Sequence, residues 1–372
     1  MLKVGITGQG GFVGMHLYNT LGLFPEQYHR IEFKKHFFQS EALLDEFVSQ
    51  CDTIVHLAAM NRHENQDLIY LTNIELVDQL IASLRRTNSK AHVLFSSSSQ
   101  EERDSCYGRS KKKGRERLMQ WAKDAGTVFT GLIIPNVFGP FGYPDYNSFI
   151  ATFCYRLTHD KEPKIESDGM VKLIYVGELV AEILNKINAG KTEAEYRIPH
   201  TAEAKVSDVL CNLRRYRALY LENGEIPSLD SDFERNLFNT YRSYIDYKAH
   251  FPVKFIKHSD ERGSFVEVIR LGVGGQVSFS TTLPGVTRGN HYHTRKIERF
   301  AVIKGKAQIQ LRKIGTGEIL NFELEGNTPA YVDMPIWYTH NIRNVGNELL
   351  YTNFWINEPY DPSDPDTYFE EV

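Results

Sequence analysis

The chain has 372 residues, more than one ordinary hydrophobic core needs and enough for two domains. Its net charge is −4, so it offers no strong positive field for nucleic acid or an anionic membrane. No apolar run approaches the roughly 20 residues of a spanning helix, and the N-terminus lacks a signal-peptide pattern. We therefore expect a cytoplasmic protein that binds no nucleic acid and does not insert into a membrane.

The four cysteines are far apart in the sequence and form no CxxC pair. This spacing argues against a disulfide framework and against a cysteine zinc site, and it predicts reduced thiols. They are Cys51, Cys106, Cys154 and Cys211.

The two halves of the chain show different patterns. Up to about residue 185, strand-like runs such as "LKVGITG", "TIVHLAA" and "FTGLIIP" alternate with amphipathic segments, which predicts an α/β Rossmann-type domain with a parallel sheet. From about residue 253, short β runs broken by glycine predict an all-β sandwich or barrel. A helical, aromatic-rich segment ends near Pro252. We expect domains at residues 1–250 and 251–372.

A glycine-rich loop lies between the first predicted strand and a helix that begins near Phe12. Gly8, Gly11 and Gly14 give the spacing GxxGxxG. Backbone amides at the helix N-terminus, including those of Phe12 and Val13, can hold a pyrophosphate. The loop therefore predicts a nicotinamide dinucleotide cofactor.

The second predicted strand, "RIEF", runs into Lys34 and Lys35. At this place an acidic residue would bind the 2′-hydroxyl of the adenine ribose, whereas a cation would favour a 2′-phosphate. The two lysines favour NADPH over NADH. The alternative is that they are ordinary solvated lysines.

The segment "CYGRSKKKGRERL" places Tyr107 and Lys111 four residues apart, on one face at the start of a helix. A lysine ammonium in that position is expected to lower the tyrosine pKa, so that the phenol can pass a proton to an alkoxide. The serines Ser96 to Ser99 end a strand, where a hydroxyl can hold a substrate carbonyl.

These motifs together resemble the extended short-chain dehydrogenase/reductase family, whose members act largely on nucleotide sugars. The matching signatures are TGxxGxxG, "HLAA", "SSSS" before "YGRSK", "PNVFGP" and "KLIYVGELV", over residues 1 to about 185. The resemblance implies Tyr107 as the acid/base, Lys111 as its tuner and nicotinamide-ribose ligand, and Ser98 as the carbonyl anchor. It also implies that Asn136 lies near the sugar.

The residues after the serines distinguish two kinds of reaction within this family. Members that dehydrate sugars carry an acidic pair straight after the catalytic hydroxyl, whereas Ser99 and Gln100 follow Ser98 here. The sequence therefore predicts simple reduction of a ketone.

The second half contains a candidate metal site. His291 and His293 are two apart, so on a strand they point to the same side. A turn can return Glu298 to that space, and His340 offers a further nitrogen through sheet pairing. Three histidines and one glutamate suit zinc or another divalent metal.

The spacing around these residues resembles the cupin family. The first cupin motif, from Gly285 to Gly305, is reproduced in full, and Pro335 and Asn344 flank the fourth ligand as in the second motif. The resemblance implies a jelly-roll barrel. One departure is Trp337, where the second motif expects glycine, and this leaves the local turn open.

The segments "SDERGSFVEVIR" and "GVTRGNHYH" resemble those cupins that epimerise nucleotide-linked 4-keto-6-deoxy sugars. The resemblance implies substrate-binding roles for Arg262, Glu267 and Arg288. Those epimerases generally work without a metal, so their proton-shuttling histidine does not carry over to His291. The base that removes the C3 proton stays open among four candidates, His258, Tyr292, Lys296 and Tyr338.

Over its whole length the chain resembles bifunctional enzymes of capsule and O-antigen synthesis. The resemblance implies a homodimer with zinc, a UDP-linked 2-acetamido-2,6-dideoxy-4-hexulose as substrate and UDP-N-acetyl-6-deoxy-L-talosamine as product. A C4 ketone acidifies the C3 proton, so epimerisation precedes reduction, which removes that acidity. Three alternatives remain: a 4-ketoreductase with a structural or regulatory cupin, a sensor that binds NADPH and a sugar nucleotide, and a redox cupin.

Overall fold

The computed structural model describes residues 1–260, 263–266, 268–269, 271–272, 274–358 and 361–372. The chain forms two compact units. The first consists of Met1–Thr152 and Ile165–Ser207, and the second of Phe153–Lys164 and Asp208–Val372. Within the described residues, no helix combines the length and apolarity that crossing a membrane requires.

The first unit is built on a six-stranded sheet in the order β2-β1-β3-β4-β5-β8, in which every pairing is parallel. Its strands are β1 (Leu2–Thr7), β2 (Tyr28–Ile31), β3 (Thr53–His56), β4 (His92–Ser98), β5 (Phe129–Ile134) and β8 (Glu193–Arg197). Because β1 lies between β2 and β3, the strand order reverses there. Ligands of open parallel sheets bind beyond the carboxyl ends of the strands at such a point.

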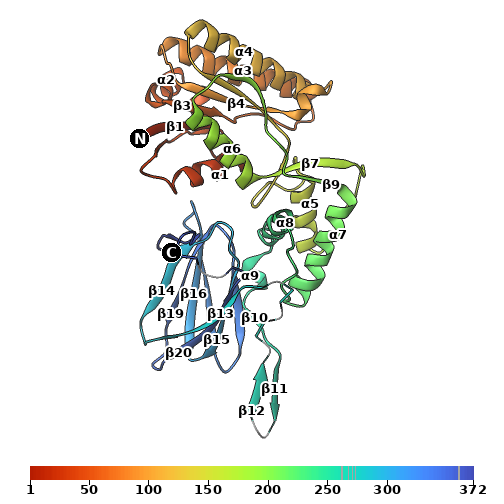
Figure 1. Ribbon diagram of the computed structural model, residues 1–372, viewed down its shortest axis with the longest axis vertical. Helices are drawn as coiled ribbons and strands as arrows, with labels where there is room; N and C mark the ends of the chain where they lie inside the picture. The colour runs from red at the N-terminus through yellow and green to blue at the C-terminus, as the bar shows by residue number, and fades with distance from the viewer. Residues whose placement is uncertain (261–262, 267, 270, 273, 359–360) are drawn as a thin grey trace. The chain divides into compact units, whose positions relative to one another are not determined.

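Helices cover both faces of this sheet (Figure 1). They are α1 (Phe12–Leu21), α2 (Glu41–Gln50), α3 (Gln66–Arg86), α4 (Cys106–Ala125) and α6 (Val176–Ala189). On β3, Ile54 packs in the cluster with α2, α3 and α4, whereas its neighbour Val55 packs in the cluster with α1 and α6. Successive side chains of a strand point to opposite faces, so a strand covered on both faces is apolar throughout.

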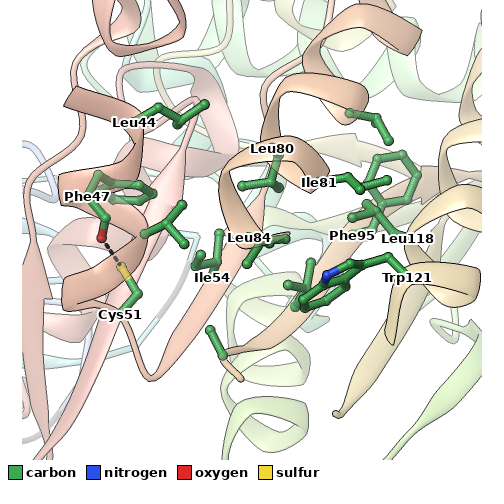
Figure 2. Packing of buried hydrophobic residues seen from close by; sticks show 14 of the residues in the cluster. Leu44, Phe47, Cys51, Ile54, Leu80, Ile81, Leu84, Phe95, Leu118 and Trp121 are labelled. Atoms are coloured by element: carbon green, nitrogen blue, oxygen red, sulfur yellow. Dashed lines mark hydrogen bonds between the residues drawn. The ribbon is translucent and has the colours of Figure 1, made fainter. Parts of the chain in front are cut away.

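Figure 2 shows the cluster on the face covered by α2, α3 and α4. Phe47, Leu84 and Trp121 come from these three helices and belong to one buried cluster with Ile54 of β3. Each is at most 2% exposed. This apolar packing fixes α4, the helix that carries Tyr107 and Lys111, against the sheet.

Polar caps set where the functional helices begin. The Ser105 hydroxyl accepts a hydrogen bond from the Gly108 amide, 3.0 Å away, at the start of α4. Asn65 caps α3 in the same way, accepting from Asp67 and Leu68 amides. Such caps satisfy amides that have no partner within the helix.

A small three-stranded sheet completes the first unit, in the order β6-β7-β9. Its strands are β6 (Asn136–Phe138), β7 (Met170–Tyr175) and β9 (Ala202–Lys205). Two helices extend across the division between the units, α5 (Phe149–Thr158) and α7 (Val206–Tyr216).

The second unit contains two five-stranded antiparallel sheets, β10-β18-β15-β20-β13 and β17-β16-β19-β14-β21 (Figure 1). The first sheet consists of β10 (Val253–Lys254), β18 (Ala330–Met334), β15 (Glu298–Lys304), β20 (Leu350–Ile356) and β13 (Gln276–Thr282). The second consists of β17 (Ile319–Glu325), β16 (Lys306–Lys313), β19 (Tyr338–Asn344), β14 (Thr287–Tyr292) and β21 (Tyr368–Phe369). A separate hairpin joins β11 (Lys257–Asp260) and β12 (Gly263–Val266). This arrangement confirms the predicted α/β domain followed by an antiparallel β domain.

Helical residues that precede the sheets belong to the same compact unit as the sheets. They are the π-helix η3 (Arg217–Glu222), α8 (Asp232–Arg242) and α9 (Tyr247–His250). Tyr220 of η3 donates to the Asp333 carboxylate at 2.6 Å, and Arg242 of α8 donates to the Met334 carbonyl at 3.1 Å. The structure thus groups these helices with the β sheets in one compact unit. The predicted domain boundary between residues 250 and 251 rests on the sequence pattern alone.

Candidate functional site

The glycine loop follows β1 and opens α1. Gly8 has φ +78°, and the Gly11 amide donates to its carbonyl at 2.9 Å. A Cβ on Gly14 would lie 2.2 Å from the Gly8 oxygen, so only glycine lets the helix approach the turn this closely. Gly11 caps α1 without any side-chain bond, and the first turn has no acidic residue. The amides of Phe12 and Val13 therefore remain suited to an anion.

The end of β2 lies beside this loop. The Phe33 amide donates to Gln9 Oε1 at 3.0 Å, which ties the residues after β2 to the glycine loop. Lys34 and Lys35 follow at once and are exposed, and Lys34 pairs with Glu32 at 3.5 Å. The sequence-predicted pair thus lies next to the predicted dinucleotide loop, with Glu32 as a nearby acid.

Tyr107 and Lys111 lie on the first turns of α4, as the spacing predicts. Lys111 is 4% exposed, and its Nζ donates to the Ser96 carbonyl at 2.8 Å. The same nitrogen lies 5.7 Å from the centre of the Tyr107 ring. Ser96 at the end of β4 and the first turns of α4 thus hold the Lys111 ammonium close to the Tyr107 ring.

The protonation of this pair differs from the sequence-based expectation. Burial raises the pKa of Tyr107 to about 12, with a smaller contribution from Tyr146. Burial also lowers the pKa of Lys111 to about 7. The predicted lowering of the Tyr107 pKa is therefore wrong for this structure, because burial disfavours the charged phenolate. A protonated phenol is nonetheless the form that donates a proton during reduction of a ketone.

The three serines that end β4 have different partners. Ser96 and Ser97 are buried, and their hydroxyls donate to the His56 carbonyl and to Glu101 respectively. Ser98 is only half-buried and accepts from the Gln100 amide at 3.1 Å, so its own O–H can still donate. Of these three, Ser98 is the one suited to hold a carbonyl.

Glu101 is the first carboxylate after these serines. Arg115 binds it through two nitrogens, at 3.0 and 3.2 Å, and Ser97 donates to it at 2.6 Å. Its side chain is 6% exposed. A carboxylate engaged in this way is unsuited to shuttle protons, which agrees with the predicted absence of dehydration chemistry.

Sequence reasoning missed two buried side chains that support this site. Asn73 of α3 bonds to both the amide and the carbonyl of Met60 and donates to Ser110 Oγ at 3.0 Å, so it ties the loop after β3 to α4. His56 bonds to Thr7 Oγ1 at 2.6 Å, and burial, followed by the charge of Lys111, lowers its pKa to about 3. His56 is part of the "HLAA" motif, which could have drawn attention to it, whereas no local pattern marks Asn73.

Asn136 begins β6. It is exposed, and its Nδ2 donates to the Lys172 carbonyl at 3.2 Å. Its predicted contact with the sugar stays a prediction.

The candidate metal ligands of the second unit converge from both of its large sheets. His291 lies on β14 directly opposite His340 of β19, while Glu298 begins β15 of the other sheet. One ligand atom from each of these and from His293 lies within 4.8 Å of the others. Glu298 Oε2 is 3.1 Å from Nε2 of both His293 and His340.

The electrostatics of this cluster suit a cation. Burial opposes the charge of Glu298, but His293 and His340 outweigh burial and lower its pKa. Burial, together with His340, lowers the pKa of His291 to about 4, which leaves the neutral imidazole that binds metals. His293 Nε2, His340 Nε2 and Glu298 Oε2 are buried, and none of them has a hydrogen-bond partner among the residues that the structure describes. These residues fit a divalent metal such as zinc, held by three nitrogens and one oxygen.

The turn before His340 keeps its shape despite the departure from the cupin motif. Trp337 adopts φ +61°, the left-handed conformation that glycine takes most easily. Its amide donates to the His293 carbonyl at 2.8 Å, and its carbonyl accepts from Ile314 at 2.9 Å. Its ring stacks on Tyr292 with centroids 5.7 Å apart. Hydrogen bonds and packing thus hold a strained tryptophan where the motif has glycine.

The predicted substrate contacts of this unit are described only in part. Arg262 and Glu267 lie outside the described residues, as does the side chain of His258. Arg288 is exposed on β14.

The other candidate bases are engaged to different degrees. Lys296 is 1% exposed and donates to the Pro365 carbonyl at 2.7 Å, which is unfavourable for a base. Tyr292 is 6% exposed and stacked between two rings. Tyr338 is half-buried, and burial raises its pKa to about 12.

Two family models match the chain. The NAD dependent epimerase/dehydratase family matches residues 4–198, and the polysaccharide biosynthesis C-terminal domain matches residues 258–368. The chain is 34% identical over 380 residues to the UDP-2-acetamido-2,6-beta-L-arabino-hexul-4-ose reductase of Pseudomonas aeruginosa, covering 99% of this chain and 98% of that relative.

Solved structures give the same picture. The capsular polysaccharide assembling protein CapF from Staphylococcus aureus is 34% identical, with all of both chains covered and a TM-score of 0.61. RMD from Pseudomonas aeruginosa, complexed with NADPH, is 17% identical, covers 59% of this chain and 83% of its own, and has a TM-score of 0.53. The second likeness concerns the fold alone.

Proposed function

The chain belongs to the NAD dependent epimerase/dehydratase family and, over its full length, to the family of CapF and the Pseudomonas aeruginosa reductase, and from this premise we propose a bifunctional nucleotide-sugar enzyme. The second unit inverts C3 of a UDP-2-acetamido-2,6-dideoxy-4-hexulose, and the first unit then reduces the C4 ketone. One observation carries the two-step assignment: a single chain holds both the Tyr107 and Lys111 pair and a buried cluster of three histidines and one glutamate.

In the reductase step, the glycine loop would hold NADPH, which would supply the hydride. The Ser98 hydroxyl donates a hydrogen bond to the C4 carbonyl oxygen, and the Tyr107 phenol transfers its proton to that oxygen as it gains charge. Lys111, fixed by Ser96, adds a positive charge beside the ring. The product is a C4 alcohol, which no longer acidifies the C3 proton.

In the epimerase step, the four ligands would hold a divalent metal, which would supply positive charge to stabilise the negative charge that develops when C3 loses its proton. His291, His293, Glu298 and His340 hold that charge in a buried space, where it acts more strongly than in water. Of the candidate bases whose side chains are described, Tyr338 is the least enclosed. We assign the cation as zinc because of its three nitrogen ligands.

Further parts of the proposal rest on the family and on charge. Lys34 and Lys35, beside the glycine loop, favour NADPH over NADH. The product is UDP-N-acetyl-6-deoxy-L-talosamine, made for capsule or O-antigen synthesis by a cytoplasmic homodimer. Arg262, Glu267, Arg288 and Asn136 contact the substrate.

The test is to incubate the protein with a UDP-2-acetamido-2,6-dideoxy-4-hexulose in deuterated water, first without and then with NADPH. NMR follows deuterium at C3 and the final sugar. We expect exchange at C3 without NADPH, loss of that exchange in His291→Ala, and reduction that depends on Tyr107. Reduction without exchange under any condition would contradict the epimerase step.

A second candidate is a 4-ketoreductase whose cupin is structural or regulatory. It is favoured by the name of the Pseudomonas aeruginosa relative, which mentions reduction alone. In that case His291→Ala would reduce an already epimerised ketone as fast as the unmodified protein, and no variant would exchange C3.

A further inference from the structure

We propose that the C-terminal segment 364–370 is a positioning element of the metal centre, with Asp366 as its central residue. The inference rests on the metal site proposed above and adds a residue that no motif marks. Asp366 is 2% exposed, although both Asp364 and Thr367 are exposed. A buried carboxylate is costly unless hydrogen bonds satisfy it, so its partners indicate what it does.

The Asp366 carboxylate binds the turn between two ligands. One oxygen accepts from the Thr294 amide at 3.0 Å and from its hydroxyl at 2.6 Å. The other accepts from the amides of Arg295 and Lys296 at 3.0 and 3.1 Å. This turn joins His293 to Glu298, so four hydrogen bonds to one side chain fix the spacing of two candidate ligands.

The backbone of the same residue orients a ligand directly. The Asp366 carbonyl oxygen lies 2.5 Å from His293 Nδ1. A carbonyl can only accept, so Nδ1 must carry the hydrogen, and the lone pair of the neutral ring is then on Nε2. Nε2 is the atom that faces Glu298. Asp366 adopts φ +40°, a conformation tolerated by aspartate that lets its carbonyl and its carboxylate serve the site at once.

The residues after Asp366 form β21, which pairs with β14, the strand that bears His291. In β21, Phe369 pairs with His291 and Tyr368 with Tyr292. The Tyr292 ring stacks on both Tyr368, at 5.4 Å, and Trp337, at 5.7 Å.

Glu370 forms backbone hydrogen bonds to a neighbour of His291 and to a neighbour of His340. Its amide donates to the Asn290 carbonyl at 3.0 Å, and its carbonyl accepts from the Thr339 hydroxyl, next to His340. Segment 364–370 thus contacts neighbours of every candidate histidine ligand. Groups that orient metal ligands from behind commonly change metal affinity 10- to 100-fold when removed.

The experiment measures metal binding, separately from turnover, in the full chain. The protein is stripped with a chelator, and zinc affinity is then determined by competition with a chromophoric chelator. The electronic absorption spectrum of the Co²⁺-loaded protein reports ligand geometry. Asp366→Asn and Asp366→Ala are compared with Glu323→Gln, a control that alters an exposed carboxylate on β17, outside the proposed element.

We expect zinc affinity to fall by about 10- to 100-fold in Asp366→Ala, to fall less in Asp366→Asn, and to stay within about twofold of the unmodified protein in Glu323→Gln. The Co²⁺ spectrum should shift in the Asp366 variants only. If Asp366→Ala does not fold, zinc affinity and the Co²⁺ spectrum are measured in Asp366→Asn and Thr294→Val instead. Thr294→Val removes one hydrogen-bond donor to the Asp366 carboxylate. Unmodified affinity and spectra in the folded variants would overturn the proposal.

The outcome is separable from that of the proposed function. A protein that binds zinc normally in every Asp366 variant refutes the positioning role but leaves epimerisation untouched. The converse outcome is that zinc affinity depends on Asp366 while no variant exchanges the C3 proton. That result supports the positioning role and contradicts the epimerase function. An unmodified protein that binds no divalent metal overturns both.

Discussion

The buried cation at the reductase site and the buried ion pairs of the second unit are held in different ways, although the first unit also contains the buried pair of Arg115 and Glu101. In the first, Lys111 is buried against neutral groups, and among the described residues no carboxylate forms an ion pair with it. In the second, Arg299 pairs with Asp333 at 2.8 Å, and Glu298 faces two histidines at 3.1 Å each. An unpaired buried cation weakens the fold but changes its protonation easily, whereas paired charges are fixed in place. We therefore expect the charge of Lys111 to respond to pH and the paired charges of the second unit to stay fixed.

The largest expected effect concerns the proton donor of the first unit. Tyr107→Phe removes the phenol and should lower the reduction rate by about 10²- to 10⁴-fold, because no other group replaces the positioned donor. Zinc content should not change. The measurement is NADPH oxidation with an epimerised 4-ketone, with Tyr18→Phe as the matched control. A loss of less than tenfold would remove Tyr107 from the chemistry.

The second effect breaks the paired charge of the second unit. Burial opposes ionisation of Asp333, but Arg299 outweighs it and lowers the pKa of that carboxyl. Asp333→Asn leaves a buried arginine unpaired and should destabilise the unit by about 3–5 kcal/mol. Urea unfolding followed by tryptophan fluorescence measures this change, because Trp337 and Trp355 lie in this unit.

Two further variants sharpen this test. Replacing both partners, by Arg299→Met with Asp333→Leu, should restore most of the stability. Glu325→Gln alters an exposed pair with Lys306 and should leave the urea midpoint unchanged. If Asp333→Asn also has no effect, the ion pair does not hold the fold.

The third effect concerns the metal ligands. Glu298→Gln keeps the shape of the side chain but removes the charge that faces His293 and His340. Zinc affinity should fall by at least about 100-fold, because a direct ligand should matter more than the groups behind it. Chelator competition measures this, with Glu323→Gln, an exposed position on β17, as the control. Unchanged affinity would place the metal elsewhere or exclude it.

The smallest effect runs in the opposite direction. The folded pKa of Lys111, about 7, lies below its ordinary value of 10.5, so burial of the ammonium costs about 5 kcal/mol below pH 7 and less as pH rises toward 10.5. Lys111→Met also leaves the Ser96 carbonyl without its donor, which offsets part of the gain. We expect a net stabilisation of about 2 kcal/mol at pH 6 to 7, which disappears near about pH 8 and becomes a net destabilisation by about pH 10, where only the lost hydrogen bond counts.

Urea unfolding at several pH values tests this expectation, with the exposed Lys112→Met as control. Reduction should fall sharply in Lys111→Met at every pH. A stability gain that does not depend on pH would show that the buried charge is not its cause.

Much of the candidate site could be predicted because its spacing is local. Tyr107 and Lys111 are one helical turn apart, and His291 and His293 are two apart around a strand end, so each pair shares a face in any fold that keeps those elements. The three glycines of the cofactor loop are likewise close in sequence, each three residues from the next. Glu298 and His340 could be added only because the cupin spacing specified them.

The sequence by itself determined the two fold classes and singled out the candidate ligand residues and the candidate reductase pair, since periodicity and short motifs express local geometry. Only the tertiary structure decided the rest. Asp366 reaches His293 from 73 positions away, Asn73 joins α3 to α4, and Trp337 takes a conformation that its residue type disfavours. It also reversed the expected pKa shift of Tyr107, because the balance between burial and a neighbouring charge depends on where the surrounding chain packs.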